Sequence, residues 1–441
     1  MVSLYIIEAY LNNYIDSLNF STLNRLESID LILTTCKLLI EYLNENLLEF
    51  CYSDKNEELH NNILELYLLN FEDNFDREIH NRDDLKNDLL NAIVISNNLI
   101  YNFVIPPRSY KSSFIRIKQT KYKKKHLRKK INYLKNIKQP EQRTNEWYIF
   151  RHKTLTASNI WKVFGSESTQ NQLIYEKCKP LTITENSVTT HVNTQTPFHW
   201  GHKYEPLSVL YYEYFYNTKI EDFGCIPHPE YNYIAASPDG INCSETSDRY
   251  GRMLEIKNIV NRDITGIPKM EYWIQMQIQM ETCGLNECDF LETRFIEYET
   301  YDDYLNDPDF QHQSSFDQST NKYRGKILHF EKDGLPMYEY HRFGLTLDEI
   351  DKWENEIMDK YKDLTWIQTI YWKLSEISCI LVLRNKIWFE KAQPYIEILW
   401  KIIEKERDGD YQHRAPKRKI KQNSITDISD NEIIHKCLIN I

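Results

Sequence analysis

The feature that most limits how this chain can fold is a pair of short segments near its middle, residues 237–240 (Ser-Pro-Asp-Gly) and residues 254–257 (Leu-Glu-Ile-Lys). The first follows an apolar stretch and predicts a strand that ends in a tight turn. The second alternates apolar and charged residues, so on a strand the charged pair Glu255 and Lys257 would project from one face. Together the segments predict two strands that bring two carboxylates and one ammonium group to a common cleft.

Asp239, Glu255 and Lys257 are therefore the candidate catalytic residues. Carboxylate oxygens suit Mg²⁺ or Mn²⁺, with water and substrate phosphate oxygens completing the coordination shell. The lysine can position or activate the attacking water. Either segment alone is also explained by an exposed amphipathic strand or an ordinary turn, and the order of the two makes the catalytic interpretation more specific.

Two polar helical segments flank these strands. Residues 200–206 (Trp-Gly-His-Lys-Tyr-Glu-Pro) begin a helical pattern, so Glu205 is expected in the first turn, where the helix dipole alone also favours a carboxylate. Downstream, Tyr272, Gln275 and Gln279 are spaced to share one helical face. A solvated face is the alternative for both glutamines, and we favour it more strongly for Gln279 than for Gln275.

A candidate anion site lies further upstream. Residues 155–159 (Leu-Thr-Ala-Ser-Asn) precede a short apolar pattern, so Thr156 or Ser158 is expected to cap a helix. A helix start with Arg151 nearby in the sequence favours a phosphate group. A capped helix beside a surface arginine is the alternative interpretation.

Charge is distributed unevenly along the 441 residues. The net charge of −11 argues against a nucleic-acid partner, yet residues 108–138 contain 13 Lys and Arg and no Asp or Glu. A flexible basic arm of this kind gains affinity by displacing counterions from phosphates. A solvated helix face or a nuclear-import signal are the alternatives, and residues 416–421 form a second, shorter basic run. The candidate contacts of the arm are Lys123, Lys124, Lys125, Arg128, Lys129 and Lys130.

Several classes of protein are disfavoured by composition. The nine cysteines are scattered without a Cys-x-x-Cys pair, which suits free thiols in a reducing compartment and argues against structural zinc. No apolar run has the length of a membrane span, and the N-terminus does not resemble a signal peptide. We therefore expect an intracellular protein without a membrane partner, at a site in the cytoplasm or the nucleus.

Periodicity divides the chain into five parts. The mixed helical and alternating pattern of the third part predicts an α/β or α+β core. Thr346 and Glu349 have capping-box spacing, which predicts a helix start. The parts are a helical N-terminal region (1–107), a basic connector (108–140), the core (141–345, with an insertion at 298–345), a helical C-terminal region (346–408) and a polar, partly basic tail (409–441).

Taken together, the segments resemble the YqaJ-type viral recombinase or lambda-exonuclease family of the PD-(D/E)xK nuclease superfamily. The resemblance covers about residues 141–297 and implies a restriction-endonuclease-like core with a mixed central sheet flanked by helices. It offers no equivalent for the helical flanks. Six motifs carry it, in order: R-x-x-E-W-x-x-x-R, L-T-A-S-N, W-G-H-x-x-E-P, A-S-P-D-G, L-E-I-K and Y-x-x-Q-x-Q.

The resemblance also implies a set of metal ligands. Asp239 and Glu255 would bind the catalytic Mg²⁺, for which Mn²⁺ is expected to substitute, and the carbonyl of Ile256 would be a further ligand. Glu205 would support the metal through bound water or a second ion.

The remaining site residues take their roles from the same resemblance. Lys257 would orient the nucleophilic water and stabilise developing charge, and Gln275 would help position the lysine or the water. Arg151 and Ser158 match family positions that hold a terminal 5′-phosphate.

The expected function is accordingly a Mg²⁺-dependent nuclease that degrades linear duplex DNA from 5′ ends in viral-type recombination, replication or repair. A single-strand annealing protein is the partner that the family suggests. The alternatives are a structure-selective endonuclease or nickase, and a non-catalytic nucleic-acid-binding protein on a nuclease fold. Some members of the family form ring-shaped trimers, and we do not extend this expectation to the present chain.

Overall fold

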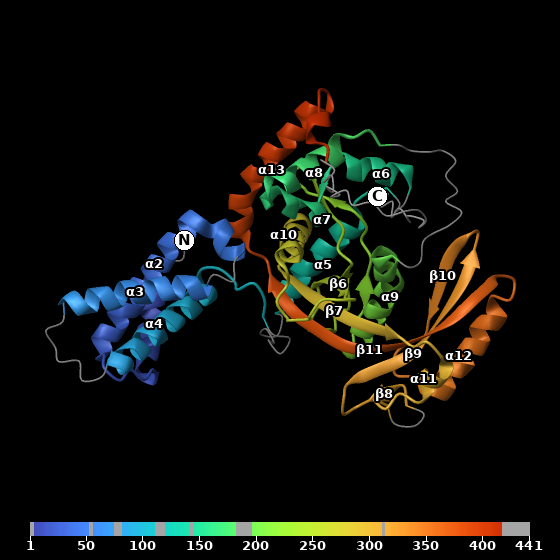
Figure 1. Ribbon diagram of the computed structural model, residues 1–441, viewed down its shortest axis with the longest axis horizontal. Coiled ribbons are helices and arrows are strands. Elements are labelled where there is room, and N and C mark those ends of the chain that lie inside the picture. Colours follow the sequence, from blue (N-terminus) through green and yellow to red (C-terminus); the bar gives the residue numbers. More distant parts are fainter. Residues whose placement is uncertain are drawn as a thin grey trace, which may run out of the picture.

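The chain forms a helical N-terminal unit, a mixed α/β core and a β-rich wing that extends the core on the opposite side (Figure 1). Arg143 and residues 417–441, which include most of the predicted tail and its basic run, lie outside the described residues. The computed structural model describes residues 4–52, 56–74, 82–110, 120–140, 144–181, 196–310 and 314–416.

The N-terminal unit confirms the predicted helical pattern. Leu31, Leu39, Leu43 and Leu47 are buried along one face of its longest helix. The unit packs against the core where this helix meets α13 (Lys386–Arg407). Its helices are α1 (Leu4–Tyr14), α2 (Arg25–Tyr52), α3 (Asn56–Asn74) and α4 (Arg82–Phe103).

The core contains a large mixed sheet, which confirms the predicted fold class. Strands β6 (Met253–Asn258) and β7 (Glu287–Glu297) are parallel, and the other neighbours in the sheet are antiparallel. The short strand β8 (Phe316–Asp317) pairs with β9 at one edge. The remaining strands, in spatial order, are β10 (Leu335–Tyr340), β9 (Lys322–Lys332) and β11 (Thr365–Leu383) before β7, and β5 (Gly240–Asn242) and β2 (Ile220–Glu221) after β6.

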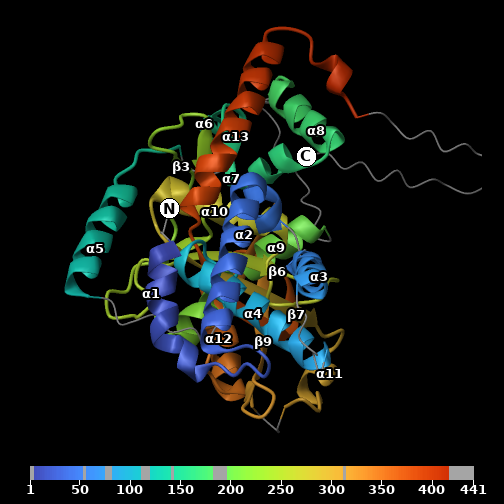
Figure 2. The same ribbon diagram turned by 90° about the vertical axis from the view of Figure 1, so that its left-hand side faces the viewer.

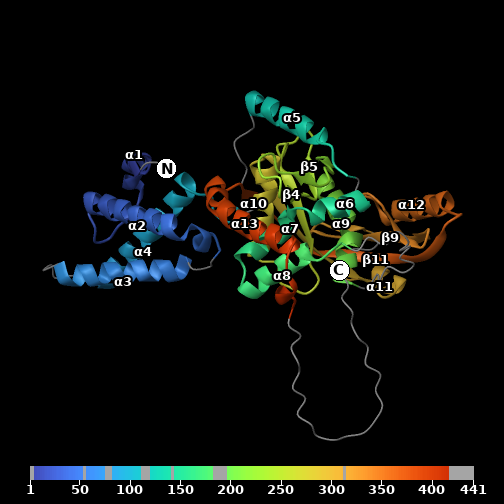
Figure 3. The same ribbon diagram turned by 90° about the horizontal axis from the view of Figure 1, so that it is seen from above.

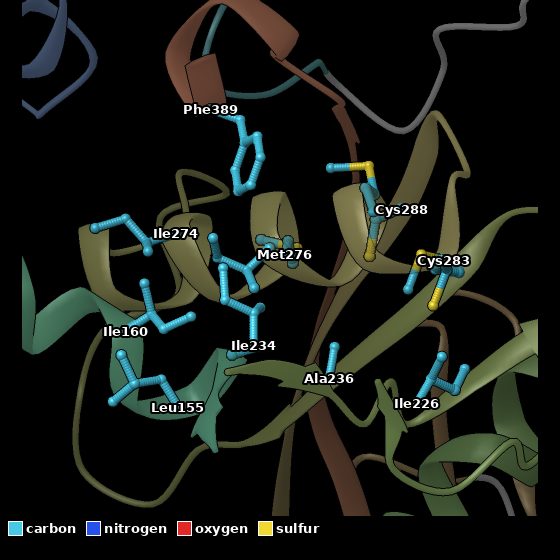
Figure 4. Close-up of a cluster of buried hydrophobic side chains, with 14 of the residues drawn as sticks. Leu155, Ile160, Ile226, Ile234, Ala236, Ile274, Met276, Cys283, Cys288 and Phe389 are labelled. Carbon is cyan, nitrogen blue, oxygen red and sulfur yellow. The ribbon is translucent and has the colours of Figure 1, made fainter. Parts of the chain in front are cut away.

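A second, smaller sheet lies beside α10 (Met270–Cys283). It consists of β1 (Leu155–Thr156), β4 (Ile234–Ala236) and β3 (Ile226–Pro227), with β1 and β4 parallel. Figure 4 shows Ile274 and Met276 of α10 close to Ile160 and Ile234, in the cluster of buried side chains that joins the small sheet to the helix. The helices around this cluster include α7 (Ala157–Ile160), the 3-10 turn at Trp161–Phe164 and α8 (Glu167–Cys178).

The opposite face of β6 is covered by α9 (Pro197–Phe215). Tyr204 and Leu207 of this helix pack in one cluster with Leu254 and Ile256 of β6. Met253, by contrast, belongs to the cluster on the α10 side. The strand therefore alternates between two buried layers, as its sequence pattern predicts.

The C-terminal region is mainly helical but contains a strand that the sequence did not suggest. The predicted capping box forms at Thr346 and Glu349 and starts α12 (Leu347–Lys360), and α13 follows later. Between them, the 19 residues of β11 pair with both β7 and β9. Short apolar runs do not distinguish helix from strand by period alone, and here the non-local partners decide. Strand β11 therefore joins the C-terminal region to the core. The other elements of the wing are α11 (Tyr301–Leu305) and β8–β10.

The basic segment is a helix, α5 (Lys121–Lys135), and not the flexible arm that we expected. Thr120 caps it by accepting a hydrogen bond from the backbone of Lys123. Ile131 and Leu134 are buried against the core, because apolar side chains recur on one face of the helix. Figures 2 and 3 show α5 lying along the outside of the core.

Two further observations concern membranes and thiols. None of the helices in the described ranges has both the length and the apolar character needed to cross a bilayer. Seven cysteines have described side chains, all with free thiols, and among these only Cys243 is partly exposed.

Candidate active site

Asp239 occupies the turn between β4 and β5. A side-chain carbon on the next residue, Gly240, would lie only 2.1 Å from Cγ2 of Ile220, so glycine is required for β2 to approach β5. The Oδ2 atom of Asp239 accepts a hydrogen bond of 2.6 Å from the backbone N–H of Ile256. This bond holds the carboxylate beside β6.

Glu255 and Lys257 project from the same face of β6, as predicted. The ammonium group of Lys257 forms an ion pair with Oε1 of Glu255. The side chain of Glu255 is fully buried, whereas 24% of the Lys257 side chain is exposed. The strand thus presents a buried acid and a reachable cation next to Asp239.

The three groups perturb one another strongly. Burial raises the pKa of Asp239 well above its usual range, and the neighbouring Glu255 carboxylate raises it further. Burial alone would lower the pKa of Lys257, but the carboxylates of Glu255 and Asp239 more than compensate and raise it. Two carboxylates held together in a desolvated place with one ammonium group would be stabilised by a divalent cation, so the residues present fit such an ion.

Glu205, the third predicted acidic ligand, is held less closely than Asp239 and Glu255. Glu205 is exposed and lines the same cleft as Asp239. It does not lie in the first turn, as we expected, because α9 begins at Pro197 and continues through Pro206. No group of three or more His, Cys, Asp or Glu side chains in the described segments forms a ready metal cage. A cation would therefore rely on two carboxylates together with backbone, water and substrate oxygens.

The burial of the two glutamines of α10 is the reverse of what we expected. Gln279, which we expected on a solvated face, is fully buried, and its Nε2 donates to Oε2 of Glu255 at 2.7 Å and to the carbonyl of Ser237 at 3.1 Å. Gln275 is only partly buried. The helix is rotated so that Gln279 supports the acidic pair.

Asp239 lines a cleft of about 640 Å³. Helix α6 (Asn145–His152) contributes Trp147 and Arg151, and the Arg151 guanidinium lies 4.6 Å from the centre of the Trp147 ring. Asp239 and Glu205 line the cleft from other elements, so Arg151 shares it with these two carboxylates. Its other lining residues are Pro206, Val209, Leu210, Glu213, Lys219, Ile220, Asp222, Ser237, Pro238, Glu339 and Tyr340.

Ser158 is placed differently from Arg151. It is exposed in α7, and its hydroxyl lies 3.2 Å from that of Thr156. Thr156 occupies the N-cap position, but its side chain makes no capping hydrogen bond, and α7 has only four residues. Ser158 is not among the residues that line the cleft. The structure therefore brings Arg151, and not Ser158, into the cleft with Asp239.

Residues 146–286 match the model of the YqaJ-like viral recombinase domain. This segment is therefore similar to that domain. It contains the sheet edge, the turn and α10, and with them every predicted metal and phosphate ligand. Helix α5, the wing and the N-terminal unit lie outside the matched residues.

Other matches extend over about two thirds of the chain. The chain is 28% identical over 320 residues to "Uncharacterized protein R354" of Acanthamoeba polyphaga mimivirus, a match that covers 65% of this chain and 56% of that protein. The chain thus spans about half the length of this relative. Among solved structures, the alkaline exonuclease LHK-Exo of Laribacter hongkongensis is 18% identical, with a TM-score of 0.34, over 62% of this chain and 97% of that chain. The same enzyme in complex with dAMP gives the same score and identity over 60% and 95%.

The YqaJ-like domain contains one supporting residue that the sequence did not reveal. The buried amine of Lys177, in α8, donates a 2.7 Å hydrogen bond to the backbone carbonyl of Arg151. Burial, followed by the charges of Arg151 and Arg407, lowers the pKa of Lys177 to about 8. The contact spans 26 positions, and no local pattern around Lys177 indicates it.

Proposed function

We propose that the YqaJ-like domain is a Mg²⁺-dependent deoxyribonuclease that hydrolyses linear duplex DNA from its 5′ ends, in recombination, replication or repair of a viral-type genome. The observation that carries this proposal is the juxtaposition of Asp239, Glu255 and Lys257 beside a cleft that Asp239 and Arg151 both line. Mn²⁺ is expected to substitute for Mg²⁺, since both accept carboxylate oxygens.

Each residue has a distinct task in this proposal. Asp239 and Glu255 would hold the cation, which supplies Lewis-acid activation of the phosphodiester when bound. The Ile256 carbonyl and Glu205 are proposed as further ligands, direct or through water. Lys257 would stabilise the negative charge that develops on the phosphate.

Substrate positioning is assigned to an arginine that lines the cleft. Arg151 is proposed to bind the terminal 5′-phosphate, because a guanidinium group makes charge-assisted hydrogen bonds to phosphate oxygens. Ser158 is proposed as its partner on the basis of the motif alone, and Gln275 keeps only the supporting role that the motif assigns. A single-strand annealing protein is proposed as partner from the family resemblance.

The test is incubation of the protein with end-labelled linear duplex and with closed circular duplex, in Mg²⁺ or in EDTA. Degradation of the linear form alone, in Mg²⁺ only, is the expected result. Cutting of the circular form would replace the proposal with an endonuclease or nickase. Binding of DNA without cleavage, both in Mg²⁺ and in EDTA, would identify a non-catalytic nucleic-acid-binding protein.

A further inference from the structure

Six of the cations of α5 fall into two groups according to what they contact. The helix contains eight Lys and Arg and no acidic residue. Three of its cations are paired with acidic residues of the core: Lys123 with Glu287 at 3.0 Å, Arg128 with Glu245, and Lys135 with Glu221 at 2.5 Å. In addition, the Lys124 amine donates to the backbone carbonyl of Glu245 at 2.9 Å. These four residues fasten the helix to the core, and the charges of the three paired cations are largely neutralised there.

A second group faces away from the core. Lys125 and Lys129 are exposed and stand four positions apart, so they lie on one helical face. That face is opposite the one formed by Ile131 and Leu134, which is buried. No acidic side chain of the described part of the chain forms an ion pair with either lysine. Tyr122, 83% exposed, belongs to the same outer face.

One end of α5 lies at the rim of the catalytic cleft. Lys135 pairs with Glu221 of β2, and the residues on either side of Glu221, Ile220 and Asp222, both line the cleft. From this end the helix extends for about 22 Å over its 15 residues. Figure 3 shows it along the outside of the core, on the side of β4 and β5.

The cleft itself does not attract a polyanion. Its lining contains five acidic side chains and only two cations, Arg151 and Lys219, in a protein with a net charge of −11. DNA that enters it must therefore be held by positive charge elsewhere. A rigid helix with unneutralised lysines, anchored at the rim, supplies that charge at a fixed position.

We propose that the outer face of α5, with Lys125 and Lys129 as its phosphate contacts, binds the backbone of the duplex whose end occupies the cleft. This inference rests on the proposed function for its choice of ligand. It assigns contact to two of the six lysines and arginines of the predicted arm. Of the others, Lys123, Lys124 and Arg128 fasten the helix to the core, and Lys130 lies in a small pocket between α5 and the core.

Binding of labelled duplex in EDTA, measured as a function of salt, tests the inference without any need for turnover. Lys125→Gln with Lys129→Gln should weaken binding and reduce the slope of log affinity against log salt by roughly 1.8, about 0.9 for each lost contact. The control is Lys401→Gln with Lys405→Gln, which removes the same charge at the same four-residue spacing from α13 and should leave the slope unchanged. Lys125→Arg with Lys129→Arg should retain the wild-type slope.

Two outcomes would overturn the inference. An unchanged slope in the variant with Lys125→Gln and Lys129→Gln would show that this face binds no DNA phosphate. The face would then bind an acidic protein partner or no partner. An equal reduction in the α13 pair would indicate a general effect of net charge. Failure of the wild-type protein to cleave DNA in Mg²⁺ would contradict the proposed function and leave this binding result standing, so the two failures are distinguishable.

Discussion

The Nε2 atom of Gln279 donates a 2.7 Å hydrogen bond to Oε2 of Glu255, 24 positions earlier in the chain. The other oxygen of the same carboxylate is bound by Lys257. Glu255 is thus held from two sides, by a residue of its own strand and by a residue of α10. A buried carboxylate with both oxygens engaged has a defined orientation, which metal binding requires.

Gln279→Met should lower the rate of DNA cleavage while keeping the shape of the side chain. Loss of a hydrogen bond to a charged group corresponds to about 1.5–3 kcal/mol, or roughly 10- to 100-fold in turnover. Measurement of kcat and KM on linear duplex checks this, with KM expected to change little. Gln275→Met is the matched control and should have a small effect; a larger effect at Gln275 would reverse our assignment.

Asp239→Asn and Glu255→Gln should each abolish cleavage and leave duplex binding largely intact. Both changes preserve side-chain volume, and each weakens the interaction with a divalent cation by removing a negative charge. Cleavage of linear duplex and binding in EDTA are the two measurements. Turnover close to that of the wild type in either folded variant would contradict the position of the site.

Lys257→Ala should reduce kcat by about 10²- to 10³-fold, as expected for the loss of one preorganised donor at developing charge. The control is Lys219→Ala, which removes a lysine that lines the adjoining cleft. A loss of tenfold or less at Lys257, or an equal loss at Lys219, would assign Lys257 a supporting role.

Arg151→Ala should remove most of the preference for a 5′-phosphorylated end over a 5′-hydroxyl end. The informative quantity is the ratio of the two degradation rates, because a general loss of folding lowers both. Lys153→Ala removes an exposed cation just after the same helix and should leave the ratio unchanged. Equal rates on the two ends in the wild type would reject a phosphate-binding role for Arg151.

The contribution of Lys177 to the free energy of unfolding should depend on pH in the alkaline range. Its pKa is about 8 in the folded protein against an ordinary value of 10.5, so between these values the unfolded state binds more protons. The free energy of unfolding of the wild type, minus that of Lys177→Met, should therefore rise as the pH increases above 8, by at most about 1.4 kcal/mol per pH unit. Below pH 8 the difference should approach a constant.

Denaturant titrations of both proteins from pH 7 to 9.5 measure this difference. Subtraction cancels the titration of the many buried tyrosines that both proteins share. A difference that stays flat across the range would show that the amine has an ordinary pKa in the folded protein.

Much of the site was determined by local sequence. Alternation at residues 254–257 placed Glu255 and Lys257 on one face, and the Pro-Asp-Gly turn placed Asp239 at a strand end. The Thr346 capping box and the helical N-terminal pattern also formed as predicted. These features depend on side-chain direction and on hydrogen bonds between residues close in sequence. A sequence period of two residues in strands, or of 3.6 residues in helices, indicates that direction.

Other features were decided only by tertiary structure. The 19 residues of β11 became a strand because β7 and β9 offered hydrogen-bonding edges on both sides. Gln279 turned inward, and α5 became a docked helix, because Glu255, Glu245 and Glu287 lay where their polar groups could reach them. All of these outcomes depend on partners far away in the sequence, and a local pattern carries no record of which distant carboxylate or strand edge a side chain will meet.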